Sequence, residues 1–230
     1  MKVNADICSM NILIAAATSL EIQPTIEFLQ QQNFSVQKKD FTVLITGIGG
    51  MTTAYNLTKS FLQNRPDHSI QAGIAGSFHS GIPIGSVVGV QEELLGDLGA
   101  EEGNHFKDIF DLGLIMENET PFNRKGLKNP HLQKQPKYGI PLVRSVGINE
   151  ITTRKERIET LTKKYNPDIE SMEGVSFHYV CLREKIPFIQ IRAISNYVGE
   201  RDKLNWNLNE AIKNLNKKLI EMVSSLANLS

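Results

Sequence analysis

Short apolar runs alternate with segments of helical spacing along most of the chain. Residues 12–17 form a continuous apolar run, which is typical of a strand buried on both faces. After it, Ile22, Ile26 and Leu29 recur at helical spacing, and Pro24 is expected in the first turn, where its missing N–H costs little. The first predicted unit is therefore a strand followed by a helix.

The later segments repeat this unit. Further strands are predicted at 41–46, 69–72, 87–92 and 188–195, apolar residues resume over 138–148, and helices are predicted at 51–63 and 174–185. Gly73 and Gly76 are expected to end the 69–72 strand. The spacing of Thr153 and Glu156 predicts a capping box for a helix that reaches Lys164. Residues 97–129 have no clear periodicity.

The last helix carries one apolar stripe, which we attribute to core packing. Its members are Leu208, Ala211, Ile212, Leu215, Leu219, Met222, Val223 and Leu226. Alternating strands and helices predict a single α/β domain with a mixed, mostly parallel central sheet flanked by helices. We expect residues 1–10 to be a short N-terminal extension and residues 11–230 to be the domain.

Composition favours a small-molecule partner. The chain has 230 residues, of which 40% are hydrophobic and 22% charged, as in an ordinary globular protein. Lys plus Arg and Asp plus Glu number 25 each, so no net field would attract nucleic acid or an anionic membrane. Cys8 and Cys181 lack metal-site spacing, and the five histidines show no metal-ligand pattern. We expect no metal and no cofactor.

A cytoplasmic location is expected. Ala15, Ala16 and Ala17 could imitate a signal-peptide cleavage site, but the preceding apolar run is too short and Asp6 interrupts the approach to it. No segment is long and apolar enough to span a bilayer. Reduced thiols also suit the cytoplasm.

Four places follow predicted strands or precede helices, where ligands bind in parallel α/β sheets. They are Glu21, the turn 47–50, the segment 172–174 and the pair Ser195 and Asn196. All four places could line one cleft. The turn alone suggests a dinucleotide site, but Thr52 stands where a third glycine should be and Asp67 lies in a loop, so we reject that interpretation.

Five segments resemble the purine nucleoside phosphorylase and nucleosidase superfamily, in family order and with similar spacing. They are 12–17 with Glu21, 46–49, 72–76, 171–174 and 191–196. The similarity is greatest to the methylthioadenosine/S-adenosylhomocysteine nucleosidases and the related futalosine hydrolases, and it covers nearly the whole chain. It implies cleavage of an N-ribosidic bond by water, with futalosine as the first choice of substrate and hypoxanthine as the released base.

The resemblance assigns the main chemical roles. Glu21 resembles the carboxylate that activates the attacking water, and Glu173 the one that binds the ribose hydroxyls, with Met172 packing on the sugar. Each Glu could instead be an exposed residue at a helix start, where the dipole favours it. The resemblance also implies contacts with the substrate for a further set of residues. This set is Thr46, Gly47, Gly76, Ile148, Asn149 and Ser195.

Asn196 departs from the adenine-specific branch, which carries a proton-donating Asp at this position. An amide cannot protonate N7, but its carbonyl can accept from a protonated N7 and its NH₂ can donate to an oxygen at C6. Asn196 therefore favours a 6-oxopurine, because a site built for one hydrogen-bond pattern rejects the opposite one. Its other interpretation is an Asx turn after a strand. The segment 196–202 also resembles futalosine hydrolases.

Several alternatives remain open. Superfamily phosphorylases hold phosphate with two arginines, but no Arg precedes Arg65 and Gln71 occupies the second position, so hydrolysis is favoured. Arg192 is expected to be a buried ion-pair member. The alternatives are a methylthioadenosine/S-adenosylhomocysteine nucleosidase and a non-catalytic nucleoside-binding protein. The family also implies a homo-oligomer, a dimer or larger.

Overall fold

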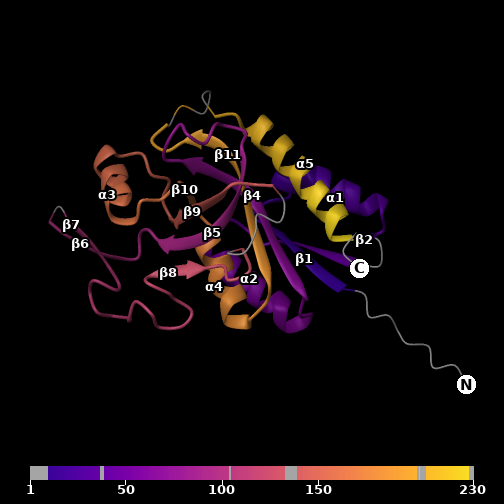
Figure 1. Cartoon of the computed structure of the whole chain (residues 1–230), viewed down its shortest axis with the longest axis horizontal. Coiled ribbons are helices and arrows are strands. Elements are labelled where there is room, and N and C mark those ends of the chain that lie inside the picture. Colours follow the sequence, from indigo (N-terminus) through magenta and orange to yellow (C-terminus); the bar gives the residue numbers. More distant parts are fainter. Residues whose placement is uncertain are drawn as a thin grey trace, which may run out of the picture.

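A computed structural model describes residues 10–36, 39–103, 105–132, 139–200, 202 and 206–227. A twisted sheet runs through the centre and helices cover it (Figure 1). The strands are β1 (Met10–Ala16), β2 (Ser35–Val36), β3 (Lys39–Ile45), β4 (His68–Ser77), β5 (Val87–Leu95), β6 (Gly99–Glu102), β7 (His105–Asp108), β8 (Gly126–Lys128), β9 (Leu142–Gly147), β10 (Ile169–Ser171) and β11 (Phe188–Tyr197). The helices are α1 (Ser19–Gln31), α2 (Gly50–Gln63), α3 (Lys155–Tyr165), α4 (Gly174–Glu184) and α5 (Leu208–Ala227).

The central sheet is mixed and partly closed. Its path is β10-β9-β5-β11-β4-β1-β3-β2, and β8 pairs with β5. The pairs β1–β3, β1–β4, β4–β11, β5–β9 and β9–β10 are parallel, whereas β5–β11 is antiparallel. Because β10 also pairs with β4, five strands form a closed circuit. The expected single α/β domain with a mixed sheet is confirmed.

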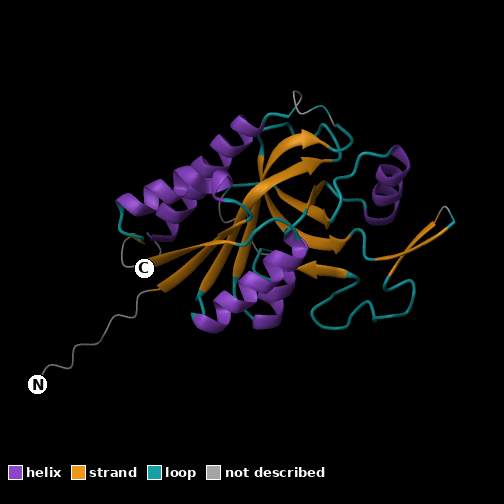
Figure 2. Cartoon of the chain, turned by 180° about the vertical axis from the view of Figure 1, so that it is seen from behind, coloured by secondary structure: helices purple, strands orange, loops and turns teal. Residues whose placement is uncertain are grey.

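Helices cover both faces of the sheet (Figure 2). Ile12 and Ile14 of β1 pack in one cluster with residues of α1 and α5, while Leu13 and Ala15 point the other way. The second cluster contains Leu57 and other residues of α2 and α4. Successive side chains of a strand point to opposite faces, so burial on both explains the unbroken apolar run.

The apolar stripe of the last helix is core packing, as expected. Ala211, Leu215, Leu219, Met222 and Val223 are buried against β1, β4 and β11. Leu208 and Ile212 lie near the start of α5 and are more accessible. The side chain of Leu226 lies outside the described residues.

Three local predictions were wrong. The third strand does not end at Gly73 but continues through Gly76 to Ser77, because β10 and β11 supply ladder partners for the glycines. Arg154, not Thr153, precedes α3, and no side-chain hydrogen bond caps that helix. Pro24 lies beyond the first turn of α1. Ile22, two residues before Pro24, has non-helical backbone angles and interrupts the helix.

The region 97–129 does contain short strands. A hairpin of β6 and β7 extends beside α3, and β8 adds to the edge of β5. Strands of three or four residues are too short to give a recognisable alternation of polar and apolar positions. The first nine residues of the expected extension lie outside the described part of the chain, and β1 begins at Met10.

The turn into α4 leaves no room for a side chain at Gly174. A β-carbon there would overlap the buried Glu93 carboxylate and lie 2.5 Å from Gln190 Nε2. Gln190 Nε2 donates to Glu93 Oε1 at 2.8 Å, so neither group can move freely. Gly174 is therefore required by close packing.

We predict that Gly174→Ala lowers the free energy of unfolding by about 2 kcal/mol, because overpacking displaces a buried hydrogen-bonded pair. Urea denaturation of purified protein measures this. Gly50→Ala is the matched control, since Gly50 also begins a helix and the one atom too close to a β-carbon there would be the Ser176 hydroxyl oxygen, at 2.8 Å. Equal destabilisation by the two substitutions would contradict the packing argument.

Candidate active site

One cavity lies beyond the carboxyl ends of β1, β4, β10 and β11. It has a volume of about 310 Å³, within the range of small-molecule sites. Its lining comprises Ala17, Thr18, Leu20, Glu21, Ile48, Ile74, Ala75, Gly76, Ile148, Ile151, Glu170, Ser171, Met172, Glu173, Ser195, Asn196, Trp206, Leu208 and Ile212. The four places chosen from the sequence thus each contribute to a single cavity. The strands β1, β4 and β11 are parallel and end at one edge, and β10 pairs antiparallel with the end of β4, which explains this convergence.

Glu21 is buried at the start of α1, not exposed to solvent. Its Oε2 accepts hydrogen bonds from the Thr18 N–H at 3.0 Å and the Thr18 hydroxyl at 3.2 Å. Its Oε1 accepts from the Ile74 N–H at 3.3 Å. Burial raises the pKa of Glu21, while Arg192 and these hydrogen bonds oppose the rise. The result is a fixed carboxylate that is more basic than an exposed Glu, which suits proton abstraction.

Glu173 faces the cavity from the residue before α4. Its Oε1 accepts from the Gly49 N–H at 3.0 Å, and its Oε2 lies 3.4 Å from Arg192 Nη1. Gly49 has a φ of 88°, a conformation that glycine adopts without strain. The glycine-rich turn after β3 therefore orients a carboxylate.

Arg192 is buried inside β11 and is paired, as predicted from its apolar surroundings. Besides Glu173, it donates through Nη2 to Gln71 Oε1 at 3.0 Å and through Nη1 to the Ile74 carbonyl at 3.4 Å. A side chain at Gly73 would collide with this guanidinium and would lie 3.2 Å from Glu21 Oε1. Gly73 thus leaves room for the guanidinium, which contacts Glu173 and lies near Glu21.

Asn196 and Ser195 lie at the end of β11, beside a register shift in its pairing with β4. The Ser195 hydroxyl donates to Asn196 Oδ1 at 2.8 Å, and Asn196 Nδ2 donates to the Tyr197 carbonyl at 3.0 Å. These bonds fix the plane of the amide. Both amide atoms keep capacity for a further hydrogen bond, since Nδ2 carries two protons and Oδ1 two lone pairs.

The structure does not bring every predicted site residue to the cavity. Gly76, Ile148 and Met172 line it, but Thr46, Gly47 and Asn149 do not. Thr46 is fully buried, and its hydroxyl donates to the Ala16 carbonyl at 3.2 Å. Asn149 is exposed, and its Nδ2 donates to Asp97 Oδ1 at 3.1 Å.

Sequence reasoning missed part of the lining. Trp206, Leu208 and Ile212 come from the segment that enters α5, whose stripe was assigned to the core alone. Glu170 was also missed. A Glu within a buried strand is itself a signal of a polar partner or a site, because Glu is almost never fully buried unless it is paired.

Two features are absent from the residues that the structure describes. No group of three or more His, Cys, Asp or Glu side chains among them could hold a metal ion. In the same part of the chain, no helix is both long and apolar enough to cross a membrane.

The family of the chain follows from a sequence comparison. The model of the phosphorylase superfamily matches residues 12–226. The chain belongs to this superfamily. The match includes all five segments on which the resemblance was based, and it spans the cavity from β1 to α5.

Relatives within the phosphorylase superfamily include two futalosine hydrolases. That of Thermus thermophilus is 32% identical over 76% of this chain and 77% of its own length. That of Streptomyces coelicolor is 27% identical over 88% of this chain and 91% of its own length. A 5′-methylthioadenosine/S-adenosylhomocysteine nucleosidase of Oceanobacillus iheyensis is 25% identical over 82% of each chain.

Solved structures share the fold. The futalosine hydrolase of Helicobacter pylori superimposes with a TM-score of 0.75 at 18% identity, covering 94% of this chain and 98% of that one. The 5′-methylthioadenosine/S-adenosylhomocysteine nucleosidase of the same organism gives 0.74 at 18% identity, with the same coverage.

Proposed function

We propose that the protein hydrolyses the N-glycosidic bond of futalosine and releases hypoxanthine, as a step in an alternative route to menaquinone. The observation that carries the proposal is the placement of Glu21, Glu173 and Asn196 around one cavity. The similarity to the Thermus and Streptomyces futalosine hydrolases supports the choice of substrate.

The carboxylates suit the charge that develops during cleavage. The ribose becomes cationic as the bond to the base breaks, and preorganised anionic groups stabilise such a charge. Glu21 takes a proton from the attacking water, which adds to the anomeric carbon while the bond electrons leave with the base. Glu173 accepts hydrogen bonds from the ribose hydroxyls and fixes the sugar for attack.

We assign Asn196 to recognition of the purine base. N7 of the departing purine takes a proton from solvent, and Glu21 later returns to solvent the proton that it took from the attacking water. The carbonyl oxygen of Asn196 accepts from the protonated N7, and its amide N–H donates to the oxygen at C6. The bond from Ser195 holds the amide in place for both contacts. This pattern matches hypoxanthine and opposes adenine, which has a donor at C6.

Water, not phosphate, is the preferred acceptor of the ribosyl group. Gln71, which stands where phosphorylases have an Arg, is buried and accepts from Arg192. Arg192 in turn pairs with Glu173, so this guanidinium is already bound to a carboxylate. A phosphate entering here would face Glu21 and Glu173, whose charges repel it.

We predict that Glu21→Gln lowers kcat by about 10²- to 10⁴-fold, because the amide cannot accept a proton from water. Release of hypoxanthine from futalosine, followed by chromatography, measures it. The wild-type rate should also fall with decreasing pH, with a midpoint above 4.5 because burial raises the pKa of Glu21. Equal, slow release by both proteins combined with tight nucleoside binding would indicate the non-catalytic alternative.

A second prediction concerns the base. Asn196→Asp should move the ratio of kcat/KM for 6-oxopurine over 6-aminopurine nucleosides at least about tenfold toward the amino substrate, because a carboxyl group can protonate N7 and lacks the N–H that binds the oxygen at C6. Competition between futalosine and methylthioadenosine, with identification of the released base, checks this. An unchanged ratio would show that Asn196 takes no part in recognition of the base.

The second candidate is 5′-methylthioadenosine/S-adenosylhomocysteine hydrolysis. It is favoured by the many such nucleosidases among the relatives and by the shared fold. If the wild type released adenine and no hypoxanthine in that competition, this candidate would replace futalosine hydrolysis.

We also propose a homo-oligomer in the cytoplasm. Large apolar side chains are exposed at the start and along one side of α2, where Met51 is 84% exposed and Ile48 and Tyr55 are each 64% exposed. Ile48 also lines the cavity, so a second copy on this surface would lie beside the substrate. The free thiol of Cys181 agrees with a reducing compartment.

For the oligomer we predict that Met51→Glu shifts the protein to a smaller species, because an unpaired charge in an apolar interface is costly. Sedimentation velocity at several concentrations measures the shift. Lys155→Glu, which changes an exposed residue on α3, is the control and should leave the distribution unchanged. A wild-type monomer at all concentrations would refute the assembly.

A further inference from the structure

Asn216 is a polar side chain on the buried side of α5, the helix that lies alongside α1 (Figure 1). It is only 2% exposed, and its neighbours Leu215 and Leu219 belong to the main apolar cluster. A buried amide is costly unless its polar groups are hydrogen-bonded. Asn216 does not line the cavity, and the cleavage described above gives it no role.

Every hydrogen-bonding position of this amide is occupied. Oδ1 accepts from the Thr25 N–H at 3.1 Å and from the Thr25 hydroxyl at 2.7 Å. Nδ2 donates to the Glu21 carbonyl and to the Ile212 carbonyl, both at 2.8 Å. An asparagine amide has two donor protons and two acceptor lone pairs, so these four contacts satisfy it completely.

Asn216 bridges two backbone groups of α1 that a regular helix would pair directly. In an α-helix the Thr25 N–H would donate to the Glu21 carbonyl, four residues earlier. Between them, Ile22 has a φ of −125° and a ψ of 16°, which interrupts the helix. The amide instead accepts from the Thr25 N–H and donates to the Glu21 carbonyl.

Glu21 is therefore held at both of its ends. Its carboxylate accepts from Thr18 and from the Ile74 N–H, and its carbonyl accepts from Asn216. The interruption of α1 comes one residue after Glu21. The contact with Asn216 thus sets the direction of the turn that carries the Glu21 side chain.

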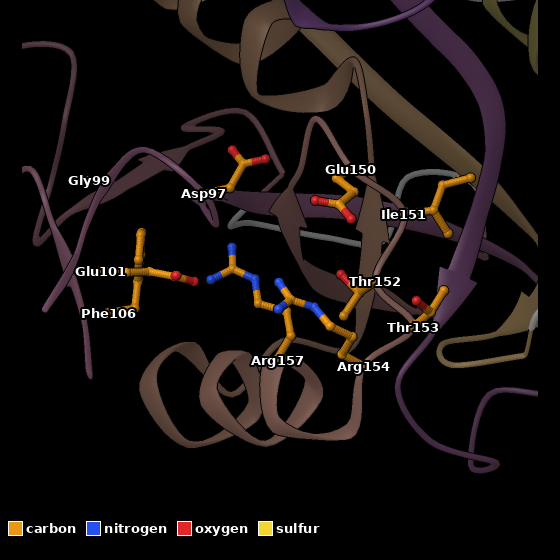
Figure 3. Close-up of a pocket in the computed structure, with 10 residues that line it drawn as sticks. All are labelled: Asp97, Gly99, Glu101, Phe106, Glu150, Ile151, Thr152, Thr153, Arg154 and Arg157. Atoms are coloured by element: carbon orange, nitrogen blue, oxygen red, sulfur yellow. The ribbon is translucent and has the colours of Figure 1, made fainter. Parts of the chain in front are cut away.

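The wall of the cavity around Ile151 is fixed by other contacts. Ile151 also lines a neighbouring cavity of about 210 Å³, into which Arg154 and Arg157 reach from α3 (Figure 3). Arg157 Nη2 donates to the Gly96 carbonyl at 2.6 Å. Glu21 does not belong to that wall, so its position depends on the contact between α1 and α5.

We propose that Asn216 is a positioning residue, which fixes the interrupted first turn of α1 and thereby holds the Glu21 carboxylate at the wall of the cavity. The inference rests on the proposed function, in which Glu21 activates the attacking water. Asn216 itself touches neither the substrate nor the water.

Asn216→Ala tests this role. Without the amide, the Thr25 N–H and the Glu21 carbonyl are free to pair directly, which would close the interruption and move Glu21 away from Thr18 and Ile74. We expect kcat for futalosine to fall at least about tenfold, since a misplacement of about 1 Å can cost about 10²-fold. KM should stay unchanged, because Glu21 acts on the water. An unchanged kcat would overturn the proposal.

Asn214→Ala is the matched control. Asn214 also lies on α5, and its Nδ2 donates to a backbone carbonyl, that of Gly85, at 2.9 Å. Its loss removes a similar bond without touching α1, so kcat should equal that of wild type. An equal fall of kcat in the two variants would show a general effect of α5 and would overturn the proposal.

A double-mutant cycle with Glu21→Gln separates positioning from a purely structural role. If Asn216 acts through Glu21, Asn216→Ala should lower kcat no further in the Glu21→Gln background. The same relative loss in both backgrounds would overturn the proposal. If Asn216→Ala does not fold, Thr25→Val, which removes only the hydroxyl bond, takes its place in the cycle. It should lower kcat about threefold, and an unchanged kcat would then overturn the proposal.

A crystal structure of Asn216→Ala, or of Thr25→Val in its place, separates this inference from the proposed function. We expect Glu21 to lose its hydrogen bond to Thr18 or to Ile74. Retention of both bonds would overturn the role of Asn216, whichever nucleoside is cleaved. Failure of the wild type to cleave futalosine would reject the proposed substrate, and the crystal structure would still decide on Asn216.

Discussion

The site depends on a guanidinium buried among carboxylates. Arg192 lies inside the sheet, where an unpaired charge would be very costly, and it is held by Glu173, Gln71 and a backbone carbonyl. Glu21 lies just beyond Gly73. The positive charge opposes the rise in the pKa of Glu21 that burial causes. Arg192 thus supplies a positive charge close to both acidic groups of this cavity.

This constraint explains features of the backbone around the cavity. Gly73 has no side chain because the guanidinium passes over it, and Gly174 has none because Glu93 and Gln190 pack beneath the turn. Gly49 turns its N–H toward Glu173. The glycines of the family segments therefore make space for charged and polar groups.

The polar side chains of the cavity form two groups. Glu21 and Glu173 lie near Arg192 and form the first group, while Asn196 and Glu170 converge above Gly76 and form the second. The closed circuit of β4, β10, β9, β5 and β11 produces this arrangement, because pairing of β10 with β4 brings Glu170 beside the end of β11. An open sheet would leave the two strand ends apart.

The sequence by itself determined the order of the main strands and helices and the α/β class, and it predicted that Glu21, Glu173 and Asn196 line one cavity. Continuous apolar runs and helical stripes are local patterns, and motifs at strand ends point to one edge of the sheet. Only the tertiary structure decided that β4 runs through Gly73 and Gly76, that Glu170 faces the cavity and that Asn149 does not. Those outcomes depend on partners far away in the chain, since a ladder neighbour and a cavity wall both arise from contacts that no local pattern encodes.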